Sequence, residues 1–108
     1  MHRDLKPSNI IYNSESDKAV LLDLGFATYF HKNDEKILTS IVGTPNYMSP
    51  ELLMGKKYNS LSDVWSFGCI VYEMLCGDVP FKGKNEKEIL NAIQTKNLNF
   101  KSSYCPTL

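Results

Sequence analysis

The apolar positions along the chain form two short runs and one long run. Apolar and β-branched residues at 9–12 and 19–22 flank an Asn-Ser-Glu-Ser-Asp turn segment, which predicts a small β-hairpin. Residues 61–76 are apolar nearly all round after Val64, and Gly77 follows them, which predicts a helix that ends at the glycine. Because such a helix is normally enclosed, we expect it to lie in the centre of a larger structure.

Two other segments carry residues typical of helix boundaries. Ser49 is followed by proline, and Gly55 lies shortly after, so a helix of one or two turns is expected between them. Ser60 has the right residue type to cap the helix over 61–76. Residues 85–95 are amphipathic, with Asn and Glu spaced like a capping pair, and predict a weaker helix.

The composition narrows the class of protein. The chain is 43% hydrophobic and 22% charged, as in ordinary folded proteins, and has 12 basic and 12 acidic residues. That balance gives no basic surface for nucleic acid. The most apolar run, 64–76, contains Glu73 and is too short to span a bilayer. We therefore expect neither a nucleic-acid partner nor a membrane segment.

The cysteines indicate the redox setting. Cys69 and Cys76 stand seven positions apart in one predicted helix, so their backbones are roughly 10 Å apart and cannot be bridged. No metal-binding spacing involves Cys105. A reducing, intracellular and cytoplasmic location is therefore the expectation. The oligomeric state is unknown from the sequence.

Residues 2–9 carry the most specific chemical pattern, His-Arg-Asp-Leu-Lys-Pro-Ser-Asn. A hydroxyl that attacks a phosphorus atom must lose a proton, and a fixed carboxylate orients the hydroxyl and accepts that proton. An asparagine oxygen suits Mg²⁺, which is a hard cation. The segment matches the catalytic-loop signature of protein kinases. The sequence therefore resembles the eukaryotic protein kinases, and Lys-Pro after the leucine resembles the serine/threonine type.

This resemblance implies a role for each reactive residue. Asp4 is the expected catalytic base, and Lys6 the cation that faces the transferred phosphate of ATP. Asn9 and Asp23 are the expected Mg²⁺ ligands. Asp23 opens an Asp-Leu-Gly motif where Asp-Phe-Gly is usual, and Leu24 is expected to alter the packing rather than metal binding.

Other residues are implied to support the site. His2 is expected to pack under the metal motif without proton chemistry, and Thr44 to hydrogen-bond near the catalytic aspartate and lysine. Asp63 is expected to accept hydrogen bonds from the catalytic-loop backbone. Glu51 belongs to Ser-Pro-Glu, where Ala-Pro-Glu is usual, and in the family it pairs with a later arginine. Because no arginine follows Arg3, Glu51 should lack that partner.

Arg3 indicates regulation by phosphorylation. In many kinases the arginine beside the catalytic aspartate binds a phosphate on the activation loop, since a phosphoryl group adds about −1.5 to −2 charge. Ser40 is the leading candidate acceptor and Thr39 the second. The alternative, an unmodified loop hydroxyl, stays open. Residues 25–45 lack a clean period and predict a long surface loop.

The fold implied by the resemblance is α+β. It is a mostly helical fragment of the large, C-terminal lobe of a protein-kinase-like fold, with a small β-hairpin near the N-terminus. Residues 1–108 would then form a partial kinase domain. Its expected parts are the catalytic loop 2–9, the metal motif 23–25, the activation segment 23–51, the central helix 61–76 and the following helix 85–95.

The expected function is a serine/threonine protein kinase that uses ATP and Mg²⁺ on a protein substrate. The chain contains neither a Gly-x-Gly-x-x-Gly loop nor a Val-Ala-Ile-Lys strand. We therefore expect the isolated chain to fold poorly and to have negligible activity. The alternative is a truncated, catalytically inactive binding module that lacks the nucleotide lobe and docks a partner.

Overall fold

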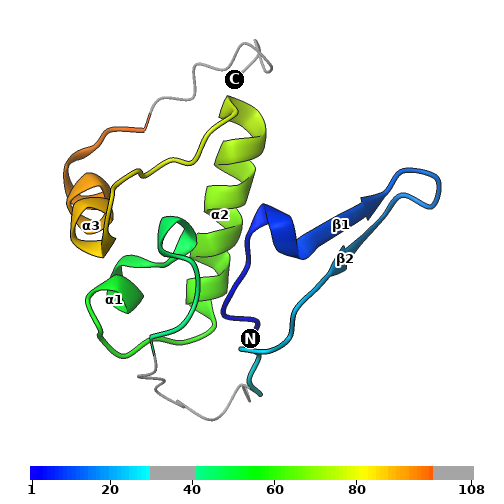
Figure 1. Cartoon of the computed structure of the whole chain (residues 1–108), viewed down its shortest axis with the longest axis horizontal. Coiled ribbons are helices and arrows are strands. Elements are labelled where there is room, and N and C mark those ends of the chain that lie inside the picture. Colours follow the sequence, from blue (N-terminus) through cyan, green and yellow to red (C-terminus); the bar gives the residue numbers. More distant parts are fainter. Residues whose placement is uncertain (30–40, 99–108) are drawn as a thin grey trace.

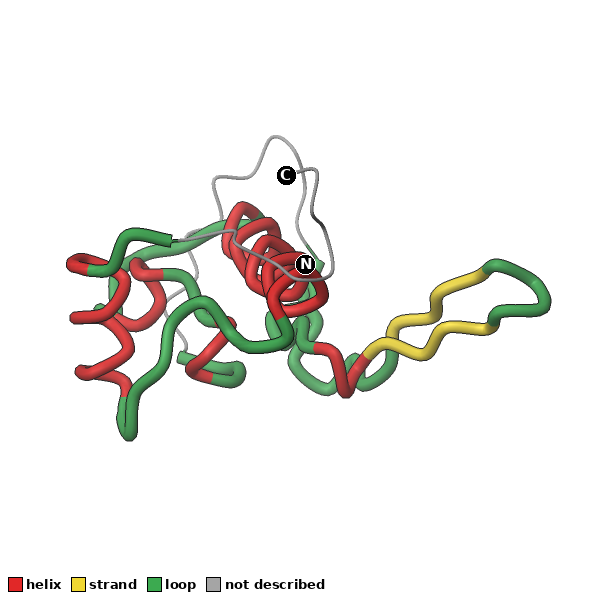
Figure 2. Tube along the Cα trace, turned by 90° about the horizontal axis from the view of Figure 1, so that it is seen from above, coloured by secondary structure: helices red, strands yellow, loops and turns green. Residues whose placement is uncertain are grey.

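The computed structural model describes residues 1–29 and 41–98. Helix α2 lies between α1 and α3 on one side and a β-hairpin on the other (Figure 1). Seen from above, the hairpin projects away from the helices (Figure 2). The elements in chain order are the 3-10 helix η1 (Pro7–Asn9), β1 (Ile10–Asn13), β2 (Lys18–Leu21), the 3-10 helix η2 (Pro45–Tyr47), α1 (Pro50–Leu53), α2 (Leu61–Cys76) and α3 (Glu86–Thr95). This content confirms the expected α+β class.

The hairpin forms where the two short apolar runs predict it. Strands β1 and β2 are antiparallel, with Ile10 opposite Leu21. The side chain of Asn13 shapes the turn, because its Oδ1 accepts hydrogen bonds from the backbone amides of Glu15 and Ser16, at 3.0 and 3.1 Å. Beyond the strand ends, the amide of Leu22 donates to the carbonyl of Asn9 at 2.8 Å. The base of the hairpin is therefore also paired.

Helix α2 has the bounds that the sequence predicts. Gly77 ends it in the left-handed conformation, at φ 80°, and donates its amide to the carbonyl of Glu73 at 2.8 Å. The predicted capping role of Ser60 is wrong, because Ser60 itself has helical backbone angles and makes no capping bond. Instead, Oδ1 of Asn59 accepts a hydrogen bond from the amide of Leu61 at 2.9 Å.

The other two helices are also present. Helix α1 is a single turn, and Ser49 precedes it without capping it. Helix α3 is capped as predicted, because the side chain of Asn85 accepts a hydrogen bond from the amide of Glu88 at 2.9 Å. The carboxylate of Glu88 in turn accepts from the amide of Lys84 at 2.7 Å. These contacts fix the start of α3, which packs against α1 and η2.

The hydrophobic core lies between α1 and the catalytic loop. It contains Met48, Leu52 and Tyr58, with Met1 and Leu53 packed against them. Only one face of α2 is buried among the described residues, so the enclosure expected for this helix is partial. No helix in the described parts of the chain has the length and apolar character needed to cross a bilayer.

Candidate active site

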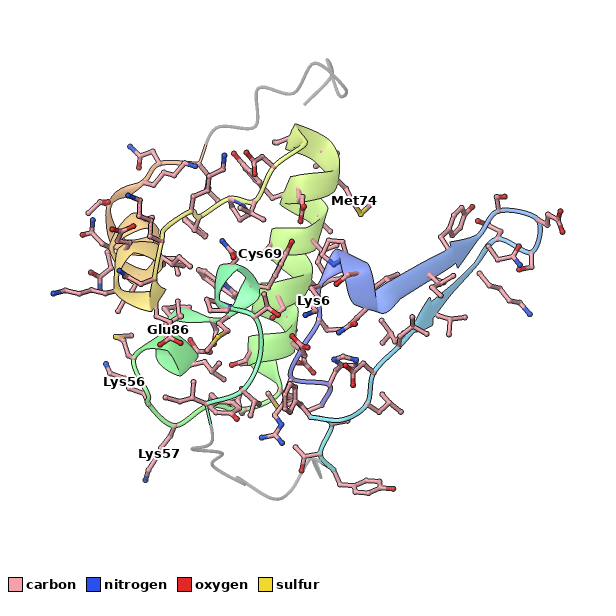
Figure 3. All side chains as sticks on the ribbon, in the orientation of Figure 1. Lys6, Lys56, Lys57, Cys69, Met74 and Glu86 are labelled. Carbon is pink, nitrogen blue, oxygen red and sulfur yellow. The ribbon has the colours of Figure 1, made fainter. Side chains whose placement is uncertain are left out.

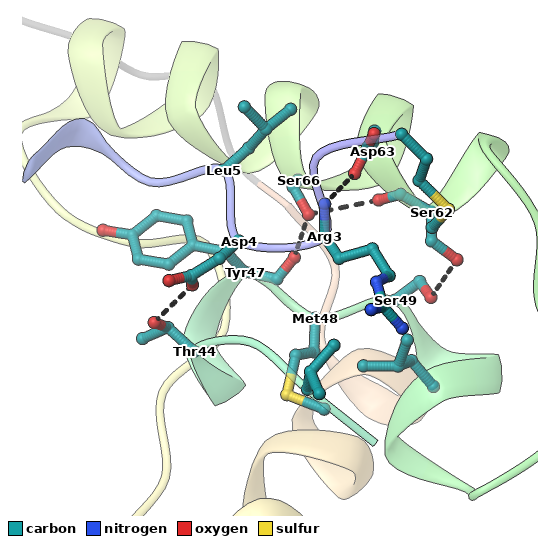
Figure 4. Close-up of a pocket in the computed structure, with 13 residues that line it drawn as sticks. Arg3, Asp4, Leu5, Thr44, Tyr47, Met48, Ser49, Ser62, Asp63 and Ser66 are labelled. Atoms are coloured by element: carbon teal, nitrogen blue, oxygen red, sulfur yellow. Dashed lines mark hydrogen bonds between the residues drawn. The ribbon is translucent and has the colours of Figure 1, made fainter. Parts of the chain in front are cut away.

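The backbone of the catalytic loop is held by α2. Arg3 has a left-handed conformation, with φ 71°, which is unfavourable for a residue with a side chain. The carboxylate of Asp63 stabilises it, because Oδ2 accepts from the amide of His2 at 2.7 Å and Oδ1 from the amide of Arg3 at 3.0 Å. These are the hydrogen bonds expected of Asp63, and Figure 4 shows its contact with Arg3.

His2 is buried and both of its ring nitrogens are engaged. Its Nε2 lies 2.9 Å from the carbonyl oxygen of Leu22, and its Nδ1 accepts from the amide of Asp4 at 3.1 Å. Because a carbonyl oxygen only accepts, Nε2 carries the proton and Nδ1 does not. Neither nitrogen is left for proton transfer. Both contacts hold the ring between the base of the hairpin and the catalytic loop.

The carboxylate of Asp4 is the centre of a small polar network. Asp4 is only 7% exposed, and its Oδ1 accepts a hydrogen bond from Thr44 Oγ1 at 3.0 Å. Lys6 Nζ lies 3.6 Å from Asp4 Oδ2 and donates to Thr44 Oγ1 at 3.0 Å. The fold thus joins residues about 40 positions apart, as the dashed contact of Asp4 in Figure 4 shows. The arrangement holds a carboxylate and a cation side by side.

Asn9 extends this network toward the hairpin. Its Nδ2 donates to the carbonyl oxygen of Asp4 at 2.9 Å and approaches Asp4 Oδ2 at 3.4 Å. Within the described residues, the side-chain oxygen of Asn9 has no hydrogen-bond partner. Asp23 lies one residue past Leu22, whose amide pairs with the carbonyl of Asn9. The base of the hairpin therefore brings the chain segments of Asn9 and Asp23 together.

Asp23 is exposed and has the left-handed backbone that a tight turn requires, with φ 56°. Its Oδ1 accepts a hydrogen bond from the amide of Gly25 at 3.1 Å. A Cβ atom at Gly25 would lie 3.0 Å from that same oxygen, which is tighter than ordinary contacts. The glycine therefore gives the carboxylate room at this turn.

The oxygens of Asn9 and Asp23 are suitable ligands for Mg²⁺. No group of three or more His, Cys, Asp or Glu in the described ranges could hold a metal by itself. Mg²⁺ is commonly bound through one or two protein carboxylates, with substrate phosphates and water completing the octahedron. One carboxylate and one amide oxygen fit that pattern.

The side chain of Arg3 is fixed between two segments. Its Nε donates to the carbonyl oxygen of Phe26 at 2.5 Å, and its Nη1 donates to the hydroxyl of Tyr58 at 3.2 Å. Arg3 therefore links the chain after the metal motif to the residues before α2. The candidate phosphorylation sites Ser40 and Thr39 lie outside the described residues.

Glu51 contacts a serine rather than a basic residue. Its Oε1 accepts a hydrogen bond from the hydroxyl of Ser62 at 2.9 Å. Across residues 1–29 and 41–98, no lysine or arginine lies within ion-pair distance of Glu51.

Sequence reasoning assigned no role to Tyr47, which ties η2 to α2. Its hydroxyl donates to Glu73 Oε2 at 2.6 Å, and its carbonyl oxygen accepts from the hydroxyl of Ser66 at 2.7 Å. Burial and then the hydrogen bond to Glu73 raise the pKa of Tyr47 above its ordinary value of 10.0. Because η2 directly follows Thr44, these contacts fix the backbone beside the Asp4 network. In the sequence, this contact was indicated by Glu73, an acidic residue inside an otherwise apolar helix.

The catalytic loop is anchored on α2, and it holds a carboxylate and a cation side by side. Residues 1–106 match the protein kinase domain family. The chain therefore belongs to the protein kinase family, which confirms the resemblance that residues 2–9 carry.

Individual relatives are similar over almost the whole chain. The chain is 47% identical over 106 residues to calcium-dependent protein kinase 5 of Plasmodium falciparum, which covers 96% of this chain and 18% of the relative. It is 39% identical over 110 residues to calcium-dependent protein kinase 10 of Oryza sativa. That match covers 100% of this chain and 18% of the relative. It is 41% identical over 99 residues to the probable serine/threonine-protein kinase nek2 of Dictyostelium discoideum. That match covers 92% of this chain and 23% of the relative. The chain thus spans less than a quarter of each relative.

Proposed function

We propose that the full-length protein is a serine/threonine protein kinase that transfers the γ-phosphate of ATP to a hydroxyl of a protein substrate. The observation that carries this proposal is the network in which Asp4, Lys6 and Thr44 meet. Membership of the protein kinase family and the names of the similar proteins support it. An intracellular location, where ATP and reduced thiols occur together, accompanies the proposal.

In this proposal Asp4 is the catalytic base. Its carboxylate orients the substrate hydroxyl and accepts its proton as the oxygen attacks the γ-phosphorus. A bond forms between that oxygen and the γ-phosphorus, the bond from the γ-phosphorus to the bridging β–γ oxygen breaks, and ADP leaves. Lys6 offsets the negative charge on the transferred group. The hydrogen bonds of Thr44 to both residues hold the side chains of Asp4 and Lys6 in fixed relative positions.

Asn9 and Asp23 would hold Mg²⁺ through their side-chain oxygens. The ion, when bound, supplies positive charge that neutralises the phosphates. Asn9 also donates to the backbone of Asp4, so the same residue would couple the metal ligand to the base. The uncommitted amide oxygen of Asn9 and the exposed carboxylate of Asp23 support this assignment.

Phosphorylation of Ser40, or in second place Thr39, would add a charge that suits Arg3. In this proposal the phosphate joins the contacts that Arg3 already makes to Phe26 and Tyr58. Phosphopeptide mapping of the active full-length protein tests it. Absence of phosphate on both residues in active protein would remove this part of the proposal.

The replacement Asp4→Asn in the full-length protein tests the function. We expect γ-phosphate transfer to a generic protein substrate to fall by about 10²- to 10⁴-fold, the range for loss of a general base. Mg-ATP should still raise the thermal stability, by about 2.7 kcal/mol at a hundredfold excess over Kd. The matched control is Glu15→Gln, an exposed acid in the hairpin turn, which should leave transfer unchanged.

The same assay separates the kinase from a docking module. A docking module would show no transfer and no stabilisation by Mg-ATP in the unmodified protein. Transfer that survives Asp4→Asn at the unmodified rate would contradict the role of Asp4.

A further inference from the structure

The side chain of Ser49 is buried but does not cap the helix that follows it. Ser49 is 1% exposed, and its Oγ lies 2.9 Å from Oγ of Ser62, which is 5% exposed. The hydroxyl of Ser62 also donates to Glu51 Oε1 at 2.9 Å. These three residues form a chain of hydrogen bonds that leaves α1, reaches α2 and returns to α1. We call it the serine relay.

The direction of the serine relay follows from the donors available. A serine hydroxyl has one hydrogen and two lone pairs, whereas an ionised carboxylate only accepts. The single hydrogen of Ser62 is committed to Glu51, so the hydrogen between the two hydroxyls must come from Ser49. Ser49 therefore donates to Ser62, and Ser62 donates to Glu51.

The serine relay lies beside the residue that holds the catalytic loop. Ser62 immediately precedes Asp63 in the first turn of α2, and Figure 4 shows the Ser49–Ser62 contact next to it. This turn has no side-chain cap from Ser60. The cavity that these residues line has a volume of about 10 Å³, room for at most one water molecule. Water therefore offers little replacement for a lost hydroxyl.

We propose that Ser49 is a positioning residue, whose hydroxyl acts through Ser62 to hold Asp63 against the amides of His2 and Arg3. The usual alanine at this position has no hydroxyl to donate, so the serine relay is a property of this chain's own pair of serines. The catalytic consequence of this inference rests on the proposed kinase function. Its structural consequence does not.

The test is amide hydrogen exchange in the full-length protein, read at His2 and Arg3, whose amides donate to Asp63. The variant Ser49→Ala should lower their protection by roughly fivefold, the effect of one hydrogen bond. The variant Ser62→Ala should lower it more, because it leaves the Ser49 hydroxyl without an acceptor and Glu51 without a donor. Ser60→Ala is the matched control on the same segment and should change nothing.

The double variant Ser49→Ala/Ser62→Ala gives the sharpest outcome. Once Ser62 is alanine, removing the stranded hydroxyl of Ser49 should raise protection above that of Ser62→Ala alone, because replacing both partners costs less than leaving one unpaired. Strictly additive losses would contradict the inference. An equal loss at amides of α3, such as Ile89, would also contradict it, since that result indicates a general loss of stability.

A kinetic arm uses the same variants. Ser49→Ala should lower kcat by roughly the same fivefold while KM for ATP stays unchanged, because only the loop geometry is altered. If the exchange pattern appears but neither the unmodified protein nor any variant transfers phosphate, the serine relay is supported and the proposed function is wrong. If phosphate transfer is present and the exchange pattern is absent, the serine relay is wrong and the proposed function is unaffected.

Discussion

One face of α2 carries Asp63, Ser66 and Glu73, and each of these side chains is hydrogen-bonded to the catalytic loop or to η2. We call them the polar stripe. The apolar stripe consists of Val64, Phe67 and Met74, which are 63%, 58% and 72% exposed. Figure 3 shows Met74 on the side of α2 that faces away from α1 and α3.

The two stripes have the same spacing along the helix and are offset by one residue, about 100° around the axis. The polar stripe contacts segments that are distant in the sequence, with 61 positions between His2 and Asp63. Among the described residues, the apolar stripe is largely open to solvent. The site therefore depends on a few hydrogen bonds from α2, and little of its geometry comes from burial of the apolar stripe.

The largest effect is expected for Asp63→Asn, in the polar stripe. An amide has one acceptor atom, so one of the two loop amides loses its partner and faces an N–H group instead. We expect the free energy of unfolding to fall by about 2–3 kcal/mol and kcat for phosphate transfer to fall about 100-fold. Urea denaturation and the transfer assay measure these two quantities. Asp78→Asn, at an exposed loop position, is the control. An equal effect of Asp78→Asn would contradict a specific role of Asp63 in holding the catalytic loop.

The next effect contrasts a buried and an exposed position of α2. Ile70 is 3% exposed and Met74 is 72% exposed. Ile70→Ala should lower the free energy of unfolding by about 2–4 kcal/mol, because it leaves a cavity. Met74→Ala should change it by less than about 0.5 kcal/mol. Urea denaturation of both variants measures the difference, and equal losses would show that the apolar stripe is packed.

A smaller effect is expected for Tyr47→Phe, which removes the hydrogen bond to Glu73. The free energy of unfolding should fall by about 1 kcal/mol at neutral pH. Burial and Glu73 raise the pKa of Tyr47 in the folded protein above its ordinary value of 10.0. The stabilisation is therefore complete below pH 10 and declines above it, where the unfolded chain ionises first. Denaturation at several alkaline pH values should show the two proteins converging, and a constant difference would refute the contact.

The smallest effect concerns the reactivity of a thiol beside the polar stripe. Burial, and then the charge of Glu73, raises the pKa of Cys69 to about 11 from an ordinary 9.0. At pH 8 the thiolate fraction is then about a hundredfold lower than for an ordinary cysteine. Mass spectrometry after brief alkylation should find Cys69 unmodified while a cysteine-containing control peptide reacts. Equal rates would contradict the burial of this thiol.

Local patterns predicted the elements well because their causes are local. The hairpin follows from its turn residues, and α2 ends at Gly77 because a left-handed residue is needed there. The cap of α3 at Asn85 was likewise predictable. The assignment of Ser60 as a cap was wrong, since the backbone at Ser60 is already helical and Asn59 fills that role. Residue type alone does not report backbone angles.

The site was predictable where a family motif covers it and less so elsewhere. The contacts of Thr44 with Asp4 and Lys6 follow from a segment match and are present in the structure. The contact of Tyr47 with Glu73, and the serine relay, join elements whose relative placement depends on tertiary packing. A sequence pattern carries no information on such distances unless a template supplies it.

The proposal with the widest consequences is that Asp4 acts beside a Mg²⁺ ion held by Asn9 and Asp23. Paramagnetic broadening by Mn²⁺ in place of Mg²⁺, with a non-hydrolysable ATP analogue and the full-length protein, tests it most directly. The NMR signals of the Asn9 side-chain amide and of Asp4 and Asp23 should broaden together, while those of Ile89 in α3 should stay sharp. Broadening that reached Asp23 but left Asn9 and Asp4 unaffected would contradict it.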